Sequence, residues 1–293
     1  MRCSEAVKLL DGFRTQELGK HNQEQLAAHL AVCGECAGEL KEITHLADNM
    51  TGLHVEAPAA VLVAVARKTS DRYAAVATDL GRIWVGFSIR GVTMVFPQAK
   101  ESAEFESIYQ DRYGRRPIPG ELPAVYAGAI AKAAAGRAGS HVPVDLSAVS
   151  DFDQKALLLL RRIPRGEVRP YSWLAREAGH PRAVRAIGNA MARNPVPLLL
   201  PCHRVVPAVG GVGGYAFGAA LKRELLAREG APIEEMERYA REGVRYIGCK
   251  TTHVYCLPSC HDVRRVRPQN RVPLPGAAEA AGAGFRPCRH CKP

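Results

Sequence analysis

The chain has 293 residues, of which 47% are hydrophobic and 24% charged, values typical of a folded globular protein rather than a disordered one. No apolar run approaches the ~20 residues that a membrane helix needs, and no secretory signal is evident, so we expect a cytoplasmic protein. Residues 1–151 carry a net charge of −2, whereas residues 152–236 and 237–293 carry +6 and +7. A basic second half is common among nucleic-acid binders, although it also fits a solvated basic face.

Residues 1–50 are predicted to form a helical unit that binds zinc. Apolar residues recur at helical spacing over residues 4–46. His29, Cys33 and Cys36 follow an H-x3-C-x2-C pattern, and Cys3 can supply the fourth ligand of a tetrahedral zinc site. The alternative is a helical hairpin with incidental cysteines. A linker over residues 51–71 is expected to follow.

Residues 72–150 are predicted to begin with a small antiparallel sheet. Three runs rich in β-branched and aromatic residues, YAAVATDL, RIWVGFSI and VTMVF, are separated by glycine-containing turns. Helices are expected over residues 101–137, interrupted by the proline-rich segment RRPIPGELP. A short extended stretch from Pro143 to Val149 should close this region.

Residues 151–232 are predicted to contain a helix-turn-helix. An apolar helix from Phe152 to Ile163 precedes two further helical segments joined by a glycine-containing turn. The second of these is expected to begin after Pro181 and to carry Arg182, Arg185 and Arg193. An ordinary helical hairpin is the alternative. Two prolines then predict an extended segment over Leu198–Leu200, which leads to the sequence PCHRV.

Nine cysteines without an export signal argue against a disulfide framework. Residues 237–293 contain two close cysteine pairs, Cys256 with Cys260 and Cys288 with Cys291, which together can form a tetrahedral zinc site. The alternative is four independently buried thiols. Cys202 lies outside the clusters, next to His203. Because an ordinary thiol titrates near pH ~8.5, a nucleophilic Cys202 needs a base, and Glu229 is a candidate to orient His203.

Residues 72–232 resemble the O6-alkylguanine-DNA alkyltransferases. The motifs that carry this resemblance are IPRGEVRPYSWLA, RAVRAIGNAMARNPVPLLLPCHRVV, GGVGGYAFG and LKRELLAREG. The resemblance implies an irreversible, stoichiometric transfer of an alkyl group from guanine O6 in double-stranded DNA to Cys202. It further implies that His203 acts as the base through water, that Glu229 orients His203, and that Asn194 braces the turn before Cys202.

The same resemblance implies how the DNA is held. Tyr171 would crowd the target phosphate and protonate the guanine ring, and Arg185 would replace the flipped base in the stack. Arg182 would be a further DNA contact. The backbone carbonyl of Val205, like that of Cys202, would select guanine through its exocyclic amine. Ala216 stands where the family often has serine, so only its backbone N–H would reach O6.

Residues 237–293 resemble the zinc-binding methylphosphotriester domain of the Ada response protein. The matching runs are RYIGCKTTHVYCLPSC and AGFRPCRHC. The resemblance implies that Cys256 is a second methyl acceptor, kept as a thiolate by the zinc that it shares with the other three cysteines of the site. His253 replaces a usual glycine, and Cys249 replaces a usual apolar residue.

Residues 1–50 resemble the zinc-binding anti-sigma domains through Cys3, His29, Cys33 and Cys36, which suggests a sigma factor or another protein as a partner. Together the patterns predict an α+β multidomain protein. Its expected parts are a helical zinc finger, a small antiparallel-sheet subdomain, an alkyltransferase domain with a helix-turn-helix, and a small zinc domain with four cysteine ligands. The alternative to DNA repair is a zinc-dependent regulator that senses methylation or redox state and binds a sigma factor.

Overall fold

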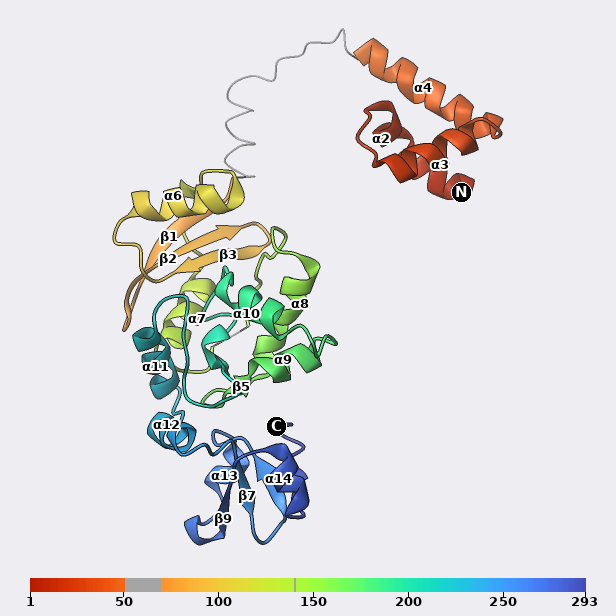
Figure 1. The fold of residues 1–293 in the computed structure, drawn as a ribbon. Helices are drawn as coiled ribbons and strands as arrows, with labels where there is room; N and C mark the ends of the chain where they lie inside the picture. Colours follow the sequence, from red (N-terminus) through yellow and green to blue (C-terminus); the bar gives the residue numbers. More distant parts are fainter. Residues whose placement is uncertain (51–69, 140) are drawn as a thin grey trace. The chain divides into compact units, whose positions relative to one another are not determined.

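The computed structural model describes residues 1–50, 70–139 and 141–293 (Figure 1). These residues form two compact units, one on each side of the gap at 51–69. The linker predicted over residues 51–71 therefore lies almost entirely outside the described residues. Within the described ranges, no helix has both the length and the apolar character that crossing a bilayer requires.

The first unit is helical, as predicted. Its elements are α1 (Cys3–Ala6), η1 (Val7–Leu9), α2 (Leu10–Arg14), α3 (Lys20–Leu30) and α4 (Gly34–Met50). The core has four fully enclosed residues, Ala6, Leu10, Leu26 and Cys36. So small a core supplies little hydrophobic stabilisation, and a unit of this size commonly needs a metal ion to fold.

The second unit begins with a four-stranded sheet in the order β3-β2-β1-β4. Its strands are β1 (Arg72–Thr78), β2 (Gly81–Ser88), β3 (Gly91–Phe96) and β4 (Ile118–Pro119). The first three pair antiparallel, which confirms the prediction, and Ala75 lies opposite Trp84 in the register of β1 and β2. Strand β4, parallel to β1, was not predicted, because two residues are too few for a periodic signal.

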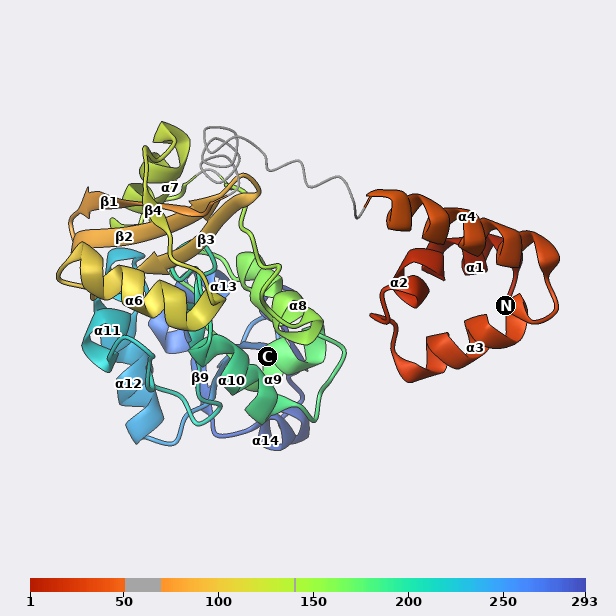
Figure 2. The same cartoon turned by 90° about the horizontal axis from the view of Figure 1, so that it is seen from above.

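The two faces of this sheet pack against different helices, because side chains alternate along a strand. Tyr73 and Trp84 pack with residues of α6 (Ser102–Tyr113) in an aromatic cluster. Ile83 and Val85 point the other way, into the main core, together with α7 (Ala124–Ala134). Both views show α6 and α7 on opposite sides of the sheet (Figures 1 and 2).

The helical region that follows contains α8 (Asp151–Leu159), η2 (Leu160–Arg162), α9 (Tyr171–Glu177) and α10 (Val184–Ala192). The second helix does begin after Pro181, at Val184, but the prediction that it carries Arg182 and Arg193 was wrong, since α10 spans Val184–Ala192. Arg182 therefore lies in the preceding turn and Arg193 at the end of the helix, while Arg185 lies on it.

The extended segment predicted at Leu198–Leu200 was also wrong. These residues form a turn, in which the Leu200 N–H donates to the Val196 carbonyl at 3.0 Å. Leu198 adopts a φ of 73°, a conformation that side chains with a Cβ rarely take. The turn leads into η3 (Cys202–Arg204) and then β6 (Val205–Val206), which pairs parallel with β5 (Arg169–Pro170).

The last part of the unit is a second small sheet with its helices. Helices α11 (Ala219–Arg228) and α12 (Ile233–Arg241) lead into it, and the strand order is β10-β8-β7-β9. The strands are β7 (Tyr246–Cys249), β8 (Val254–Cys256), β9 (Arg271–Leu274) and β10 (Arg286–Pro287); the helices are α13 (His261–Arg264), η4 (Pro268–Asn270) and α14 (Ala277–Gly282).

Candidate functional site

Cys202 lies in the wall of a cavity of about 330 Å³, formed by α9, α10 and the loop before α11. The thiol-bearing residue is only 4% exposed, so a reacting group must enter the cavity to reach the sulfur. The residues that line it are Tyr171, Gly188, Met191, Ala192, Cys202, Gly214, Tyr215 and Ala216. The structure thus brings together three residues singled out from the sequence: Tyr171, Cys202 and Ala216. Arg182 and Arg185 are exposed and lie outside this lining.

Asn194 fixes both the turn and the sulfur. Its Oδ1 accepts from the Val196 N–H at 3.1 Å, and its Nδ2 donates to the Leu200 carbonyl at 2.8 Å. The same Nδ2 lies 3.0 Å from Cys202 Sγ. Tyr215 contacts the sulfur from the other side, with 3.8 Å between its hydroxyl oxygen and Sγ. One amide side chain therefore holds the strained turn and the thiol in a single geometry.

Behind Cys202, a buried charge network surrounds His203. His203 Nε2 lies 2.9 Å from Glu229 Oε1, at the end of α11. Arg204 donates to both oxygens of the same carboxylate, with Nε at 2.9 Å and Nη2 at 2.8 Å. The other ring nitrogen, His203 Nδ1, is buried and has no hydrogen-bond partner among the described residues. Nδ1 is therefore the atom that remains available to accept a proton.

The electrostatics of these groups follow from their burial. Burial raises the pKa of the Cys202 thiol and lowers the pKa of His203. Burial alone would also raise the pKa of Glu229, but the hydrogen bonds and charges of His203 and Arg204 outweigh it and hold that pKa at about 2. At neutral pH the site therefore contains a neutral thiol, a neutral imidazole and an ionised carboxylate, which is the arrangement a histidine base requires.

Lys222 is a site residue that the sequence reasoning missed. It is 1% exposed, and its Nζ donates to the carbonyls of Val205 at 2.7 Å and Gly214 at 3.1 Å. Burial lowers the pKa of Lys222 to about 8, and a negative charge on Cys202 would oppose this shift. The available signal was its helical position, since Lys222, Leu225 and Leu226 share the buried face of α11.

The four cysteines of the second small sheet form a candidate metal centre, which we call the four-cysteine centre. Cys256, Cys260, Cys288 and Cys291 are all buried, and their sulfur atoms lie within 4.8 Å of one another. Backbone N–H groups of Leu257 and His290 donate to two of these sulfurs, at 3.4 and 3.3 Å. Four clustered thiols with amide donors fit a tetrahedral zinc ion, which would hold them as thiolates.

Two family models match the chain. The "6-O-methylguanine DNA methyltransferase, DNA binding domain" matches residues 151–231, and the "Metal binding domain of Ada" matches residues 235–293. A methylated-DNA–protein-cysteine methyltransferase of Mycolicibacterium paratuberculosis is 38% identical over 112 residues, which cover 37% of this chain and 68% of that protein. The chain belongs to the methylated-DNA–protein-cysteine methyltransferase family. We call residues 151–231 the alkyltransferase domain and residues 235–293 the zinc module.

Other relatives match shorter parts. The human methylated-DNA–protein-cysteine methyltransferase is 56% identical over 72 residues, 25% of this chain and 35% of that protein. The bifunctional transcriptional activator/DNA repair enzyme Ada of Escherichia coli is 42% identical over 88 residues, 30% of this chain and 25% of that protein. A crystal structure of the Mycobacterium tuberculosis O6-methylguanine methyltransferase is 30% identical, with a TM-score of 0.44, and covers 54% of this chain and 92% of its own. The chain thus spans only about a third of the human relative.

Two departures in the zinc module have structural consequences. His253, which the resemblance to the Ada domain marks as replacing a glycine, adopts a φ of 51°, the left-handed region that favours glycine. Cys249 is buried, with its sulfur 3.2 Å from the Thr251 hydroxyl. Burial alone would raise the pKa of Cys249, but hydrogen bonds from Thr251 and Thr252 bring it down to about 7.

The helical first unit also brings its predicted ligands together. The ligand atoms of Cys3, His29, Cys33 and Cys36 lie within 4.8 Å of one another. His29 Nε2 is 3.4 Å from Cys36 Sγ, and the sulfurs of Cys3 and Cys33 are 3.8 Å apart. His29 lies at the end of α3 and Cys36 in the first turn of α4, so a zinc ion here would join the two helices.

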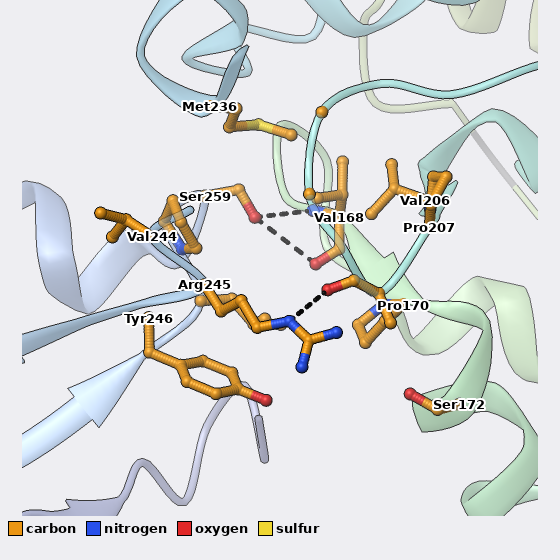
Figure 3. Close-up of a pocket in the computed structure, with 15 residues that line it drawn as sticks. Val168, Pro170, Ser172, Val206, Pro207, Met236, Val244, Arg245, Tyr246 and Ser259 are labelled. Atoms are coloured by element: carbon orange, nitrogen blue, oxygen red, sulfur yellow. Dashed lines mark hydrogen bonds between the residues drawn. The ribbon is translucent and has the colours of Figure 1, made fainter. Parts of the chain in front are cut away.

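The zinc module docks directly on the alkyltransferase domain, around a second cavity of about 170 Å³ (Figure 3). Ser259, which lies between two of the zinc cysteines, is fully buried; its Oγ accepts from the Val168 N–H at 3.0 Å and lies 3.4 Å from the Val168 carbonyl. Arg245 Nε donates to the Ala208 carbonyl at 3.2 Å. Val168 immediately precedes β5, which leads to Tyr171 and pairs with β6, the strand after Cys202. The module therefore contacts the chain next to the Cys202 site.

Proposed function

We propose that this chain repairs alkylated DNA by transferring an alkyl group from guanine O6 to Cys202. The observation that carries the proposal is the Cys202 site: a buried thiol in a cavity, held by Asn194, beside a neutral histidine whose partner is an ionised Glu229. Membership of the methyltransferase family supports this function over the alternative of a sigma-factor regulator. The substrate is double-stranded DNA with the damaged base flipped into the cavity.

The reaction is a single displacement. A water molecule carries the Cys202 proton to His203 Nδ1, the sulfur attacks the alkyl carbon, and the bond from that carbon to O6 breaks. The leaving guanine takes a proton from Tyr171, because burial raises the pKa of this phenol and keeps it protonated at neutral pH. Tyr171 then regains a proton from solvent, and His203 releases to solvent the proton that it took from Cys202. The product is a thioether, which no group in the site can cleave, so each chain reacts once.

The DNA contacts follow the arrangement of α9 and α10. Arg185, exposed on α10, fills the gap left by the flipped base, and Arg182 contacts the backbone from the turn before it. The Ala216 N–H reaches O6. The Val205 carbonyl already accepts from Lys222, and the Cys202 carbonyl accepts from the Val205 N–H, so each binds the exocyclic amine through its second lone pair.

Intact-protein mass spectrometry tests the transfer. After incubation with duplex DNA containing O6-methylguanine, the wild-type chain should gain one methyl group on the peptide that contains PCHRV. Cys202→Ala should bind the same DNA and gain none there. A Cys202→Ala chain that still removes the methyl group from guanine O6 would show that another residue is the acceptor.

We propose a second transfer, from DNA methylphosphotriesters to Cys256. It rests on the four-cysteine centre and on the match of residues 235–293 to the metal-binding domain of Ada. A zinc ion with four thiolates carries −2, and methylation of Cys256 would change this to −1, which weakens the repulsion of DNA phosphates. The surrounding basic residues are Arg264, Arg265, Arg267, Arg271, Arg286, Arg289 and Lys292.

Three of these basic residues have partners inside the protein: Arg264 donates to the Gly166 carbonyl, Arg271 pairs with Glu235 at 2.9 Å, and Lys292 pairs with Glu177 at 3.3 Å. The other four carry the expected gain in DNA affinity: Arg265, Arg267, Arg286 and Arg289. Affinities of the Cys202→Ala chain should therefore rise after exposure to methylphosphotriester DNA, and the gain should shrink as salt increases. Unchanged affinity with Cys256 methylated would refute the charge effect but leave the transfer standing.

For the first unit we propose one zinc ion at Cys3, His29, Cys33 and Cys36, and a protein partner such as a sigma factor. The cluster of ligand atoms supports the metal. Metal analysis of the full chain should find one zinc fewer in Cys3→Ser/Cys33→Ser than in the wild type. An unchanged count would rule out this site.

A further inference from the structure

A third group of metal-ligating side chains lies at the boundary between the alkyltransferase domain and the zinc module. Glu167 belongs to the alkyltransferase domain, and Cys260, His261 and His290 belong to the zinc module. One ligand atom from each lies within 4.8 Å of the others. We propose that this group binds a divalent metal ion of the zinc type, in addition to the zinc ion of the four-cysteine centre, and that the Cys260 sulfur is a ligand of both ions.

The distances suit coordination of one ion. Glu167 Oε1 lies 3.1 Å from His290 Nε2 and 3.7 Å from His261 Nδ1, separations close to those between neighbouring ligands of a tetrahedral zinc. The two imidazole rings have centroids 4.6 Å apart. Arg169 binds the opposite oxygen, Oε2, at 2.8 Å, so it orients the buried Glu167 carboxylate and leaves Oε1 facing the histidines.

A second, independent observation is that one nitrogen in this group has no hydrogen-bond partner. His261 Nδ1 is buried and makes no hydrogen bond among the described residues. Its other nitrogen, Nε2, lies 3.3 Å from Asp262 Oδ1. A carboxylate at Nε2 keeps the ring proton there and presents the Nδ1 lone pair to the group, which is the usual arrangement of a metal-bound histidine. A metal ion would satisfy this orphaned atom.

The donor set selects the class of metal. One thiolate, two imidazoles and one carboxylate oxygen suit zinc and similar transition metals, whereas calcium and magnesium prefer oxygen ligands alone. The charge also favours binding, because the zinc-loaded four-cysteine centre with Glu167 carries −3 and a second divalent ion reduces this to −1. Glu167 lies two residues before β5, so an ion bound by Glu167 and by the zinc module would link the module to the strand that precedes Tyr171.

Zinc stoichiometry of the full chain tests the proposal, and it does not depend on any methyl transfer. Zinc-loaded protein is desalted and counted by native mass spectrometry for the wild type, Glu167→Gln and His261→Asn/His290→Asn. The matched control is His253→Asn, a histidine of the same module outside the group. Wild type and control should each retain one zinc ion more than the two site variants.

Equal zinc counts in all four proteins would overturn the proposal and leave Glu167 as a hydrogen-bond acceptor only, from the His261 backbone N–H at 3.2 Å and from His290. Glu167 is buried, so its variant has the greater risk of misfolding. The His261 and His290 side chains are 44% and 39% exposed, and the double variant therefore decides the outcome if Glu167→Gln does not fold.

Discussion

Glu229→Gln tests the buried charge network most directly. The carboxylate accepts hydrogen bonds from His203 and Arg204, and its pKa is about 2 instead of the ordinary 4.5. A depressed carboxylate pKa contributes stability above the unfolded pKa and loses it as pH falls through the folded pKa. Ionised Glu229 therefore contributes about 3 kcal/mol to the free energy of unfolding at pH 7. This contribution is lost between pH 4.5 and about pH 2, so about 1 kcal/mol remains at pH 3.

Denaturant unfolding of the full chain measures this contribution. Trp84 and Trp173 are the two tryptophans of the chain, and both are buried in the second unit, so their fluorescence reports on its unfolding. The matched control is Glu224→Gln, on the same helix, whose exposed pair with Arg228 should contribute less than about 1 kcal/mol. Zinc release at low pH affects all three proteins alike, so the comparison is between variants at each pH.

Glu229→Gln should also slow methyl transfer on the order of 10²-fold or more, because His203 loses the charge that stabilises its protonated form, while DNA binding stays unchanged. Mass spectrometry over time gives the rate. A loss of stability that is equal at pH 3 and pH 7 would contradict the assigned pKa. A wild-type transfer rate in the variant would contradict the role of Glu229 in orienting the base.

Three further variants test other parts of the site. Lys222→Met should slow transfer at least 10-fold, because the Val205 and Gly214 carbonyls lose their shared donor. The control is Lys155→Met, on the exposed part of α8, and equal transfer rates in the two variants would refute the role of Lys222. Arg185→Ala should slow repair of duplex DNA more than transfer from free O6-benzylguanine, whereas equal losses would indicate a folding defect. Ser259→Ala should destabilise the docked zinc module by about 1–3 kcal/mol, because the buried Val168 N–H loses its acceptor; unchanged hydrogen exchange at that amide would refute the contact.

Local patterns in the sequence correctly predicted several elements and the clustering of one set of metal-ligating residues. Alternating apolar residues and glycine turns predicted β1 to β3, and the spacing of Cys256, Cys260, Cys288 and Cys291 predicted a site whose sulfurs the structure does cluster. The prediction failed at Leu198–Leu200, where an apolar run between prolines resembled a strand. Asn194 overrides that preference, since its side chain holds both ends of the turn.

Only the tertiary structure could decide which distant groups meet. The sequence identified His203 and Glu229, but it could not show that Arg204 shares the carboxylate or that His203 Nδ1 is left free. Glu167 and His290, which are 123 positions apart, meet because β5 and the zinc module dock against each other. Periodicity and motif spacing report on neighbours along the chain, whereas the pKa values and the boundary between the two domains depend on burial and on long-range contacts.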